Sequence, residues 1–423
     1  MNDFVRKPIM FLQVVLFVAA VICTNTSAKP GEGENVGWKA IFDGKTLDGW
    51  EVRSGFAKYH VEDGVIVGTT VKDSPNTFLC TEKQYGDFIL EFEVKVDPAL
   101  NSGVQIRSNA YETDTTTWMW RDNQKRKAVH KAGRVYGYQV EICNEQTGSS
   151  GGIYDEARRG WLDDISNDPV ASKAFKDNQW NKYRVACIGD SIKTWVNDVP
   201  CADLVDSMTL TGFIGLQVHG FKGDKPAQVC WRNIRIEELG RHVWKPLFDG
   251  KSLAGWHTLP GGKWEVRDGV IEGSNTSSDK RHGLLVSDTN YKDFTVRLKF
   301  KALKGNSGLY FRADEIKSEV GVHGFQAEID QSKDVGGLYE TGGRGWVVQP
   351  ASEDVKKWFE PQDWNQMTVS AHGQRIVVHV NGLKSAELKK DEGRPEGYLA
   401  LQLHGGQDVN VMFKDVEILL PEK

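Results

Sequence analysis

The chain has 423 residues, of which 39% are hydrophobic and 26% charged, and its formal net charge is -5. This composition is typical of a soluble globular protein, and the length suits two domains of about 150 to 200 residues. The acidic balance gives no reason to expect a nucleic-acid partner.

The N-terminus carries the pattern of a cleaved secretory signal. Arg6 and Lys7 precede an apolar run at residues 9–23, and Thr26 and Ala28 supply the small residues of a cleavage site. An uncleaved membrane anchor is the alternative, although the run is short for a span. We expect residues 1–28 to be a signal peptide, and the mature protein to be exported with no further membrane span.

The cysteines give little information about disulfides or metal binding. Five cysteines follow the signal, all in the first half of the chain. An odd number leaves at least one unpaired in a monomer, and the second half has none, so disulfides are not a general requirement of this fold. No CxxC spacing indicates a metal site.

The mature sequence is duplicated. Four blocks return in the same order: 42–50 (FDGKTLDGW) at 248–256, 85–108 at 291–313, 136–142 at 323–329, and 151–161 at 336–346. Their spacing of about 185 to 206 residues corresponds to a domain rather than to a solenoid repeat. We therefore predict two domains of one fold, 36–240 and 243–421, called copy one and copy two below.

Each copy consists of short alternating strands with turn signals between them. Asp-Gly turns occur in EDGVI (62–66) and RDGVI (267–271), and WVNDVP (195–200) and HVNGLK (379–384) carry Asn-Asp and Asn-Gly. Such dipeptides favour two-residue hairpins. Helical periodicity is confined to short pieces such as 169–175 and 352–359. The pattern predicts an all-β fold with an antiparallel sandwich in each copy.

Copy one carries an insert, residues 109–135, where copy two has only 314–322. The insert contains Trp118, Trp120 and a basic cluster with His130. It is either a decorated surface loop or a lid or sugar-stacking platform over an open face.

Three strands in each copy place polar side chains at alternate positions. Because side chains alternate along a strand, the apolar residues between them are expected in the core and the polar ones on one outward face. An exposed structural hydrogen-bond ladder is the alternative to a site, but these planar groups suit sugar hydroxyls and proton transfer. They are Gln105, Arg107, Gln139, Glu141, Gln217 and His219 in copy one, and Tyr310, Arg312, Gln326, Glu328, Asp330, Gln402 and His404 in copy two.

Tyr154 and Tyr339, with Arg159 and Arg344 close in sequence, occupy matching loops. We expect Tyr154, Tyr339 and Arg344 at the rim of a binding face, although the tyrosines could equally be hydrophobic plugs. The matching tryptophans of the two copies are expected in the cores: Trp50, Trp180, Trp256 and Trp364.

The ordered set FDGKTLDGW, NSG followed by an arginine, a Gln/Glu strand, WN, VNG and LQVHG resembles the 3-keto-disaccharide hydrolase family. Both copies match, so the resemblance covers nearly all of the mature chain. It implies two tandem concanavalin-like jelly-roll β-sandwich domains, and a carbohydrate or glycoside substrate. The family's central strand more often runs Glu-x-Gln, whereas both copies run Gln-x-Glu.

The resemblance also implies chemistry on glycosides oxidised to a ketone at C3. A base removes the acidified C2 proton, the C1 substituent leaves, and water adds to the enone, which requires a base, an acid and a group that holds the enolate. A divalent metal is a candidate cofactor, and a non-catalytic carbohydrate-binding protein is the alternative function. The candidates are Glu141 and Glu328 as bases, His219 and His404 as acids or metal ligands, and Arg107 and Arg312 at the enolate oxygen.

Overall fold

We describe a computed structural model that covers residues 37–121, 124–331 and 333–422. The chain divides into two units, Met1–Gly37 and Trp38–Lys423, and only the second is described below. The expected signal peptide lies outside the described residues, so export stays a prediction. Among the described residues, no helix has the length and apolar character needed to cross a membrane. Their five cysteines are all free thiols.

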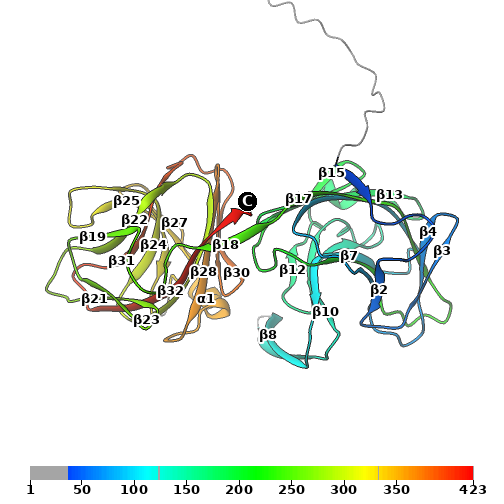
Figure 1. Ribbon diagram of the computed structural model, residues 1–423, viewed down its shortest axis with the longest axis horizontal. Helices are drawn as coiled ribbons and strands as arrows, with labels where there is room; N and C mark the ends of the chain where they lie inside the picture. The colour runs from blue at the N-terminus through cyan, green and yellow to red at the C-terminus, as the bar shows by residue number, and fades with distance from the viewer. Residues whose placement is uncertain (1–36, 122–123, 332, 423) are drawn as a thin grey trace, which may run out of the picture. The chain divides into compact units, whose positions relative to one another are not determined.

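Copy one contains an eight-stranded back sheet and a seven-stranded front sheet, both antiparallel (Figure 1). The back sheet runs β15 (Val199–Val205), β14 (Ser191–Val196), β13 (Asn181–Ile188), β6 (Asp87–Val96), β17 (Gln228–Gly240), β4 (Val65–Thr69) and β3 (Lys58–Glu62), with β1 (Trp38–Ala40) paired to β17. The front sheet runs β12 (Gly160–Asp163), β11 (Ile153–Glu156), β10 (Val135–Ile142), β7 (Ser102–Ala110), β16 (Phe213–Val218), β5 (Thr77–Thr81) and β2 (Trp50–Arg53).

Copy two repeats both sheets with the same connectivity. Its back sheet runs β20 (Lys263–Arg267), β21 (Val270–Asn275), β32 (Val409–Pro421), β23 (Phe294–Lys304), β28 (Asn365–His372), β29 (Arg375–Val380) and β30 (Leu383–Leu388), with β18 (His242–Pro246) paired to β32. Its front sheet runs β19 (Trp256–Leu259), β22 (Gly283–Tyr291), β31 (Gly397–Leu403), β24 (Ser307–Glu315), β25 (Val322–Ile329), β26 (Leu338–Thr341) and β27 (Gly345–Val348). The predicted fold of two tandem jelly-roll β-sandwiches is confirmed.

The turns and the short helical pieces follow the sequence signals. Asn197 and Asp198 have φ of 49° and 66°, and Asn381 and Gly382 have φ of 50° and 78°. Two consecutive positive φ angles are what a tight hairpin between twisted strands requires. The expected helical pieces are one 3₁₀ turn, Ala171–Lys173, and one short helix, α1 (Ser352–Trp358).

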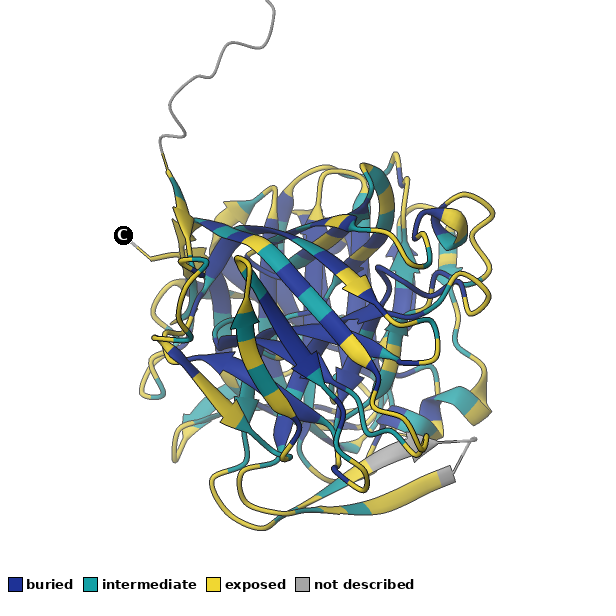
Figure 2. Cartoon of the chain, turned by 90° about the vertical axis from the view of Figure 1, so that its right-hand side faces the viewer, coloured by how far each residue is buried: buried dark blue, intermediate teal, exposed yellow. Residues whose placement is uncertain are grey.

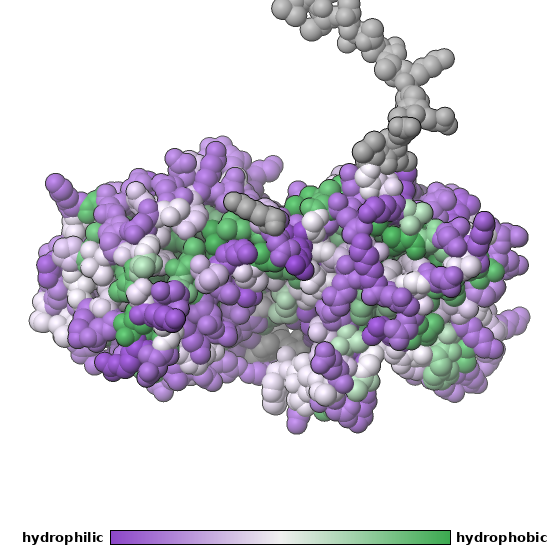
Figure 3. Space-filling view, viewed as in Figure 1, coloured by the Kyte–Doolittle hydropathy of each residue, from purple (hydrophilic) through white to green (hydrophobic). Residues whose placement is uncertain are grey.

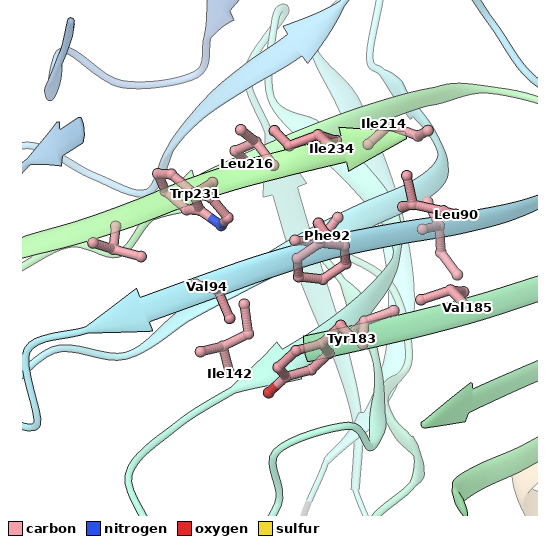
Figure 4. Close-up of a cluster of buried hydrophobic side chains, with 14 of the residues drawn as sticks. Leu90, Phe92, Val94, Ile142, Tyr183, Val185, Ile214, Leu216, Trp231 and Ile234 are labelled. Atoms are coloured by element: carbon pink, nitrogen blue, oxygen red, sulfur yellow. The ribbon is translucent and has the colours of Figure 1, made fainter. Parts of the chain in front are cut away.

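The core of each copy lies between its two sheets. In copy one, Phe92 from the back-sheet strand β6 and Trp231 from β17 meet Leu216 from β16 of the front sheet, all fully buried (Figure 4). Burial alternates along the strands in Figure 2, as expected for sheets packed face to face. Figure 3 shows hydrophilic side chains over most of the face in view, with small hydrophobic patches between them.

The matching tryptophans divide into two kinds. Trp50 and Trp256 are each 8% exposed, and their indole nitrogens donate to backbone carbonyls, as expected of core residues. Trp180 and Trp364 are only half-buried and lie under the cations of Arg232 and Lys414, so the prediction that they are core residues is wrong. A cation over an indole face stabilises such a partly exposed ring.

The outer faces of the two back sheets carry the same ion pair with its charges exchanged. In copy one, Glu91 on β6 lies opposite Arg235 on β17, with 2.6 Å between Oε2 and Nη2. In copy two, Arg297 on β23 takes the place of the glutamate and lies opposite Glu417 on β32, with 2.7 Å between Nε and Oε2. The arginine stacks on a tryptophan in both copies, on Trp38 or on Trp244.

We expect this pair to be exchangeable in copy two. Arg297→Glu places two carboxylates on directly opposite residues and should cost about 1 kcal/mol, because like charges repel across a strand pair. Adding Glu417→Arg should recover most of that loss, since copy one already carries the glutamate on the equivalent strand. Urea unfolding of the single and double variants measures this, and a double variant no more stable than the single one would contradict it.

Candidate functional site

In each copy, a glutamine side chain from one central strand of the front sheet lies over a glycine of the neighbouring strand. In copy one, Gln139 on β10 is opposite Gln105 on β7, and the neighbouring Gly103 is opposite both Glu141 and Gln217. A Cβ added to Gly103 would lie 2.5 Å from the Gln139 side chain. The glycine of the NSG motif is therefore required because the glutamine occupies the space above it.

The amides of copy one form a hydrogen-bonded chain that ends on Glu141. Gln105 and Gln217 both donate to Gln139 Oε1, at 2.8 and 2.9 Å. Gln139 Nε2 donates to Glu141 Oε2 at 3.1 Å, and Asn101 donates to Glu141 Oε1. Both carboxylate oxygens are thus held by amide donors.

Copy two builds a similar chain around Glu328, in which the bond between the glutamines of the two strands runs in the opposite direction. Gln326 Nε2 lies 2.8 Å from Glu328 Oε2 and 3.1 Å from Gln402 Oε1, and Asn306 donates to Glu328 Oε1. Gly308 leaves the space for Gln326, since a Cβ there would be 2.5 Å from its amide nitrogen. The Gln-x-Glu order of the strand therefore places the carboxylate within reach of the amide chain in both copies.

The amide chain does not face open solvent as the sequence pattern predicted. Gln105 and Gln217 are fully buried, and Gln139 is 3% exposed. The segment that enters β10 folds over the sheet: Val135 packs with Phe78, Cys80 and Phe213, and its N–H donates to Ser54 Oγ at 2.8 Å. The glutamines hence form an internal hydrogen-bond ladder, whereas the alternative that the sequence left open was an exposed one.

Tyr310, which stands where copy one has Gln105, is buried in the same way. It is 1% exposed and packs with apolar residues that include Leu284, Val322 and Ala400. Its hydroxyl lies 2.9 Å from Thr341 Oγ1 and 3.3 Å from Gln402 Nε2. Tyr310 and Gln402 therefore belong to the interior support of Glu328.

Arg107 and Arg312 do not lie on the polar face, so their predicted place beside the glutamates is wrong. Their φ angles are 45° and 47°, and the strand register shifts at both positions. This bulge changes the phase of the side-chain alternation. Arg107 is fully buried, donates to the carbonyls of Gly86 and Gly189, and pairs with Asp87 at 2.8 Å.

Arg312 is engaged in the same manner. Its guanidinium donates to the Lys292 carbonyl at 3.0 Å and to the Arg394 carbonyl at 3.3 Å, and it is 2% exposed. Neither arginine is placed to stabilise an enolate at the glutamates. Both instead connect loops by donating to their backbone carbonyls.

Glu141 and Glu328 are buried ionisable groups of the two front sheets. Glu141 is 6% exposed, and burial raises its pKa to about 7 even though Asn101 and Gln139 donate to its carboxylate. Glu328 is 5% exposed, and burial raises its pKa to about 8, opposed by Asn306 and reinforced by the charge of Asp330. A carboxyl with a pKa near neutrality is suited to proton transfer.

His219 and His404 follow directly after the strands that carry Gln217 and Gln402, and both are half-buried. The backbone N–H of His404 donates to the backbone carbonyl of Asn306, whose side chain holds Glu328. His219 follows Val218, which pairs with Ser102, so it lies next to Asn101 in the same way. In each copy the strand register therefore places the histidine beside the asparagine that holds the glutamate.

Sequence reasoning missed His282, which belongs to copy two alone. Its ring centroid is 4.4 Å from that of His404, and its Nδ1 is 2.8 Å from Gln402 Nε2. Asn76 holds the equivalent position in copy one, immediately before β5. A comparison of the two copies at this position was the one signal that could have revealed it.

The rim residues have mixed outcomes. Tyr154 lies opposite Gln139 and meets the edge of Trp161, and Tyr339 lies opposite Gln326 and meets the edge of Trp346, with ring centroids 5.4 Å apart in each pair. Trp161 and Trp346, which we did not predict, are 42% and 36% exposed. Half-buried aromatic pairs at a sheet edge are suited to stacking against a sugar.

Arg344 is occupied by two carboxylates rather than directed at the glutamate. Its Nη1 lies 2.7 Å from Asp391 Oδ2, and its Nε pairs with Glu340. These two partners hold its pKa above the ordinary value. Asp330, two residues beyond Glu328, is half-buried and accepts from the Lys333 N–H at 3.4 Å.

The insert of copy one forms a hairpin, β8 (Thr115–Arg121) and β9 (Gln124–His130), whose strands pair with each other. It joins the end of β7 to the start of β10, which is the end of these strands away from Glu141. Trp118 is 62% exposed, His130 stacks on Tyr111, and the exposed hairpin is visible at the bottom of Figure 2. Trp120 belongs to β8, but its side chain lies outside the described part.

The candidate metal has no ready ligand set. Within the described ranges, no three His, Cys, Asp or Glu side chains are grouped so that they could hold a metal ion.

Replacing the glycine under the amide should break the support of the carboxylate. In Gly308→Ala, the added methyl group occupies the place of the Gln326 amide, so Gln326 must move and Glu328 loses a donor. We expect a loss of about 1 to 3 kcal/mol in the free energy of unfolding. Gly103→Ala is the matched change in copy one, and urea midpoints equal to wild type for both variants would show that the glutamines are not fixed above the glycines.

The buried carboxyl should make the folded protein less stable at high pH. The pKa of Glu328 is raised to about 8 from an ordinary value of 4.5, so the folded state holds the proton more tightly than the unfolded state. The stabilisation by the bound proton is fully present below about pH 4.5 and is lost as the pH rises from there to about 8. Glu328→Gln removes this loss, which is roughly 3 to 5 kcal/mol at pH 9 and under about 1 kcal/mol at pH 5.

Urea unfolding at pH 5 and pH 9 measures this difference. The exposed Glu396 offers a matched control, since Glu396→Gln makes the same carboxylate-to-amide change at a solvent-exposed position. Parallel pH dependences in wild type and Glu328→Gln would contradict the shifted pKa.

Comparison with known proteins agrees with the sequence resemblance. The model of the 3-keto-alpha-glucoside-1,2-lyase-like domain matches residues 37–237 and again residues 243–419. A 3-keto-disaccharide hydrolase of Bacteroides thetaiotaomicron is 32% identical over 83 residues, and this match covers 17% of the present chain and 28% of that relative.

Solved structures overlay on less than half of the chain each. The carbohydrate-binding module CBM66 of Bacillus subtilis is 18% identical with a TM-score of 0.31, covering 38% of this chain and 93% of the module. A Bacillus subtilis protein with a galectin-like fold is 14% identical with a TM-score of 0.33, and the match covers 43% of this chain and 96% of that protein. The family match extends over both copies and most of the sequence, and this chain therefore belongs to the family of the 3-keto-alpha-glucoside-1,2-lyase-like domain.

Proposed function

We propose that this protein cleaves the glycosidic bond of 3-keto-glycosides, with the buried glutamate as the base. The observation that carries the proposal is the carboxyl with a pKa near neutrality, fixed by two amide donors beside a histidine. The family named above and the partial match to a 3-keto-disaccharide hydrolase support this choice of substrate.

The chemistry uses the groups present in either copy. The glutamate takes the proton from C2, which the neighbouring C3 ketone acidifies. The electron pair of the C2–H bond forms the C1=C2 double bond, and the C1–O bond breaks with its pair going to the leaving oxygen. A protonated histidine, His219 or His404, gives that oxygen a proton. Addition of water across C1=C2, with hydroxyl at C1 and hydrogen at C2, completes a net hydrolysis.

A carbohydrate-binding protein is the second candidate. The Tyr154–Trp161 and Tyr339–Trp346 pairs favour it, because they present half-exposed rings at the edge of each front sheet. Binding at these rings does not require the glutamates, whereas cleavage does. The two candidates therefore differ in their response to a change at the glutamate alone.

The mature protein is assayed on a 3-keto-glucoside with a chromogenic leaving group. We expect release of the chromophore by wild type, and a loss of at least about 100-fold in kcat when Glu141→Gln and Glu328→Gln are combined, because the amide cannot accept the proton. Glu396→Gln serves as the surface control. Sugar binding without release by wild type would support the binding protein instead.

The dependence of the rate on pH identifies the working base. A carboxyl acts as a base only when it is ionised, so kcat/KM should rise with pH through the pKa of the base. Rates that depend on Glu141 should rise through about 7, and rates that depend on Glu328 through about 8. Glu328→Gln and Glu141→Gln separate the two, and a profile that falls over this range would instead make the glutamate the acid.

A further inference from the structure

The proposed reaction needs a hydrogen-bond donor for the C3 oxygen, where negative charge grows as the C2 proton leaves. The arginines expected in this place are occupied elsewhere, since Arg107 and Arg312 bond to backbone carbonyls. A donor must therefore come from another residue near the glutamate.

Copy two offers such a donor in His282. Gln402 Nε2 donates to His282 Nδ1 at 2.8 Å, so Nδ1 accepts and the ring proton of the neutral imidazole is on Nε2. The same Gln402 accepts from Gln326, which donates to Glu328. One amide chain thus fixes both the carboxylate and the tautomer of the imidazole.

The neighbouring His404 presents the complementary group. Its Nδ1 lies 2.7 Å from the carbonyl of Gly405 and 3.2 Å from Gln407 Nε2. The shorter contact, to the carbonyl, places the proton of the neutral ring on Nδ1 and leaves the lone pair on Nε2. The two rings are 4.4 Å apart and half-buried. A donor and a group that can carry the leaving-group proton therefore lie side by side, and His404 is bonded to Asn306, the residue that holds Glu328.

Copy one has no equivalent of this donor. Asn76 stands where copy two has His282, and its side chain is already used: Oδ1 accepts from the Gly220 N–H at 2.9 Å, and Nδ2 lies 3.4 Å from Glu156 Oε1. At the end of the amide chain, Gln217 Oε1 is buried and has no hydrogen-bond partner among the described residues. The chain of copy one thus ends without the imidazole that ends the chain of copy two.

We propose that His282 is a further catalytic residue, that it donates from Nε2 to the C3 oxygen of the 3-keto sugar, and that copy two is consequently the working copy. The inference rests on the proposed function. Hydrogen bonding alone is involved at His282, so the proton balance of the cleavage is unchanged: Glu328 gains the C2 proton and His404 loses one to the leaving oxygen.

The electrostatics of His282 agree with this role. Burial, and next the charge of His404, lower the pKa of His282 to about 4, so the ring is neutral at physiological pH and keeps its Nε2–H. A neutral imidazole donates to a developing oxyanion without itself losing a proton.

The test is the replacement of His282 by asparagine, the residue that copy one carries at the equivalent position. His282→Asn should lower kcat on the chromogenic 3-keto-glucoside by about 100- to 1000-fold, the effect of removing one oxyanion donor, while KM stays within a few-fold. His323 is exposed on β25, so His323→Asn is a matched control and should keep the rate of wild type. Urea midpoints of both variants show that each is folded.

The remaining outcomes are distinguishable. If wild type releases no chromophore, the proposed function fails and this inference fails with it. If wild type is active and His282→Asn keeps half of its kcat or more, the function stands and the assignment to His282 and copy two is overturned. A loss confined to KM would make His282 a binding residue and overturn its role at the C3 oxygen.

Discussion

The support of each glutamate depends on a residue that has no side chain. Gly103 and Gly308 lie on the middle strand of their front sheets, and the glutamine of the next strand occupies the space above them. From there one amide reaches both the carboxylate on its own strand and the glutamine beyond the glycine. Three strands are thereby joined by a single side chain, and the carboxylate is fixed without a charged partner.

The period-two alternation made much of this predictable, and its failures have physical causes. The sandwiches, the turns and the Gln, Glu and His strands follow from local pattern and turn chemistry. Arg107 and Arg312 were misplaced because a bulge with positive φ shifts the alternation, and an arginine does not signal that backbone as a glycine would. The burial of Gln105 could not be read locally, since Val135 covers the sheet from a segment distant in sequence.

The two copies show where residue identity matters and where only complementarity does. On the back sheets, the Glu91–Arg235 pair returns as Arg297–Glu417 with the charges exchanged, because either order satisfies an ion pair. At the front sheets the amide next to the carboxyl, the carboxyl and the histidine after the strand keep the same positions, whereas Tyr310 replaces Gln105. A carboxylate only accepts, so the bond from the amide to the carboxylate has a fixed direction and its two members cannot be exchanged in this way.

The free-energy cost of burying an ionisable carboxyl argues against a purely structural role for the two glutamates. Each carboxyl accepts on both oxygens, from Asn101 and Gln139 in copy one and from Asn306 and Gln326 in copy two, whereas the rest of the ladder is built from neutral amides. The carboxyl instead has to be desolvated, which raises its pKa to about 7 or 8 and weakens the fold wherever it is ionised. A group that costs stability in both sandwiches, and that is held in a position where it can exchange a proton near neutral pH, is accounted for by chemistry at the site.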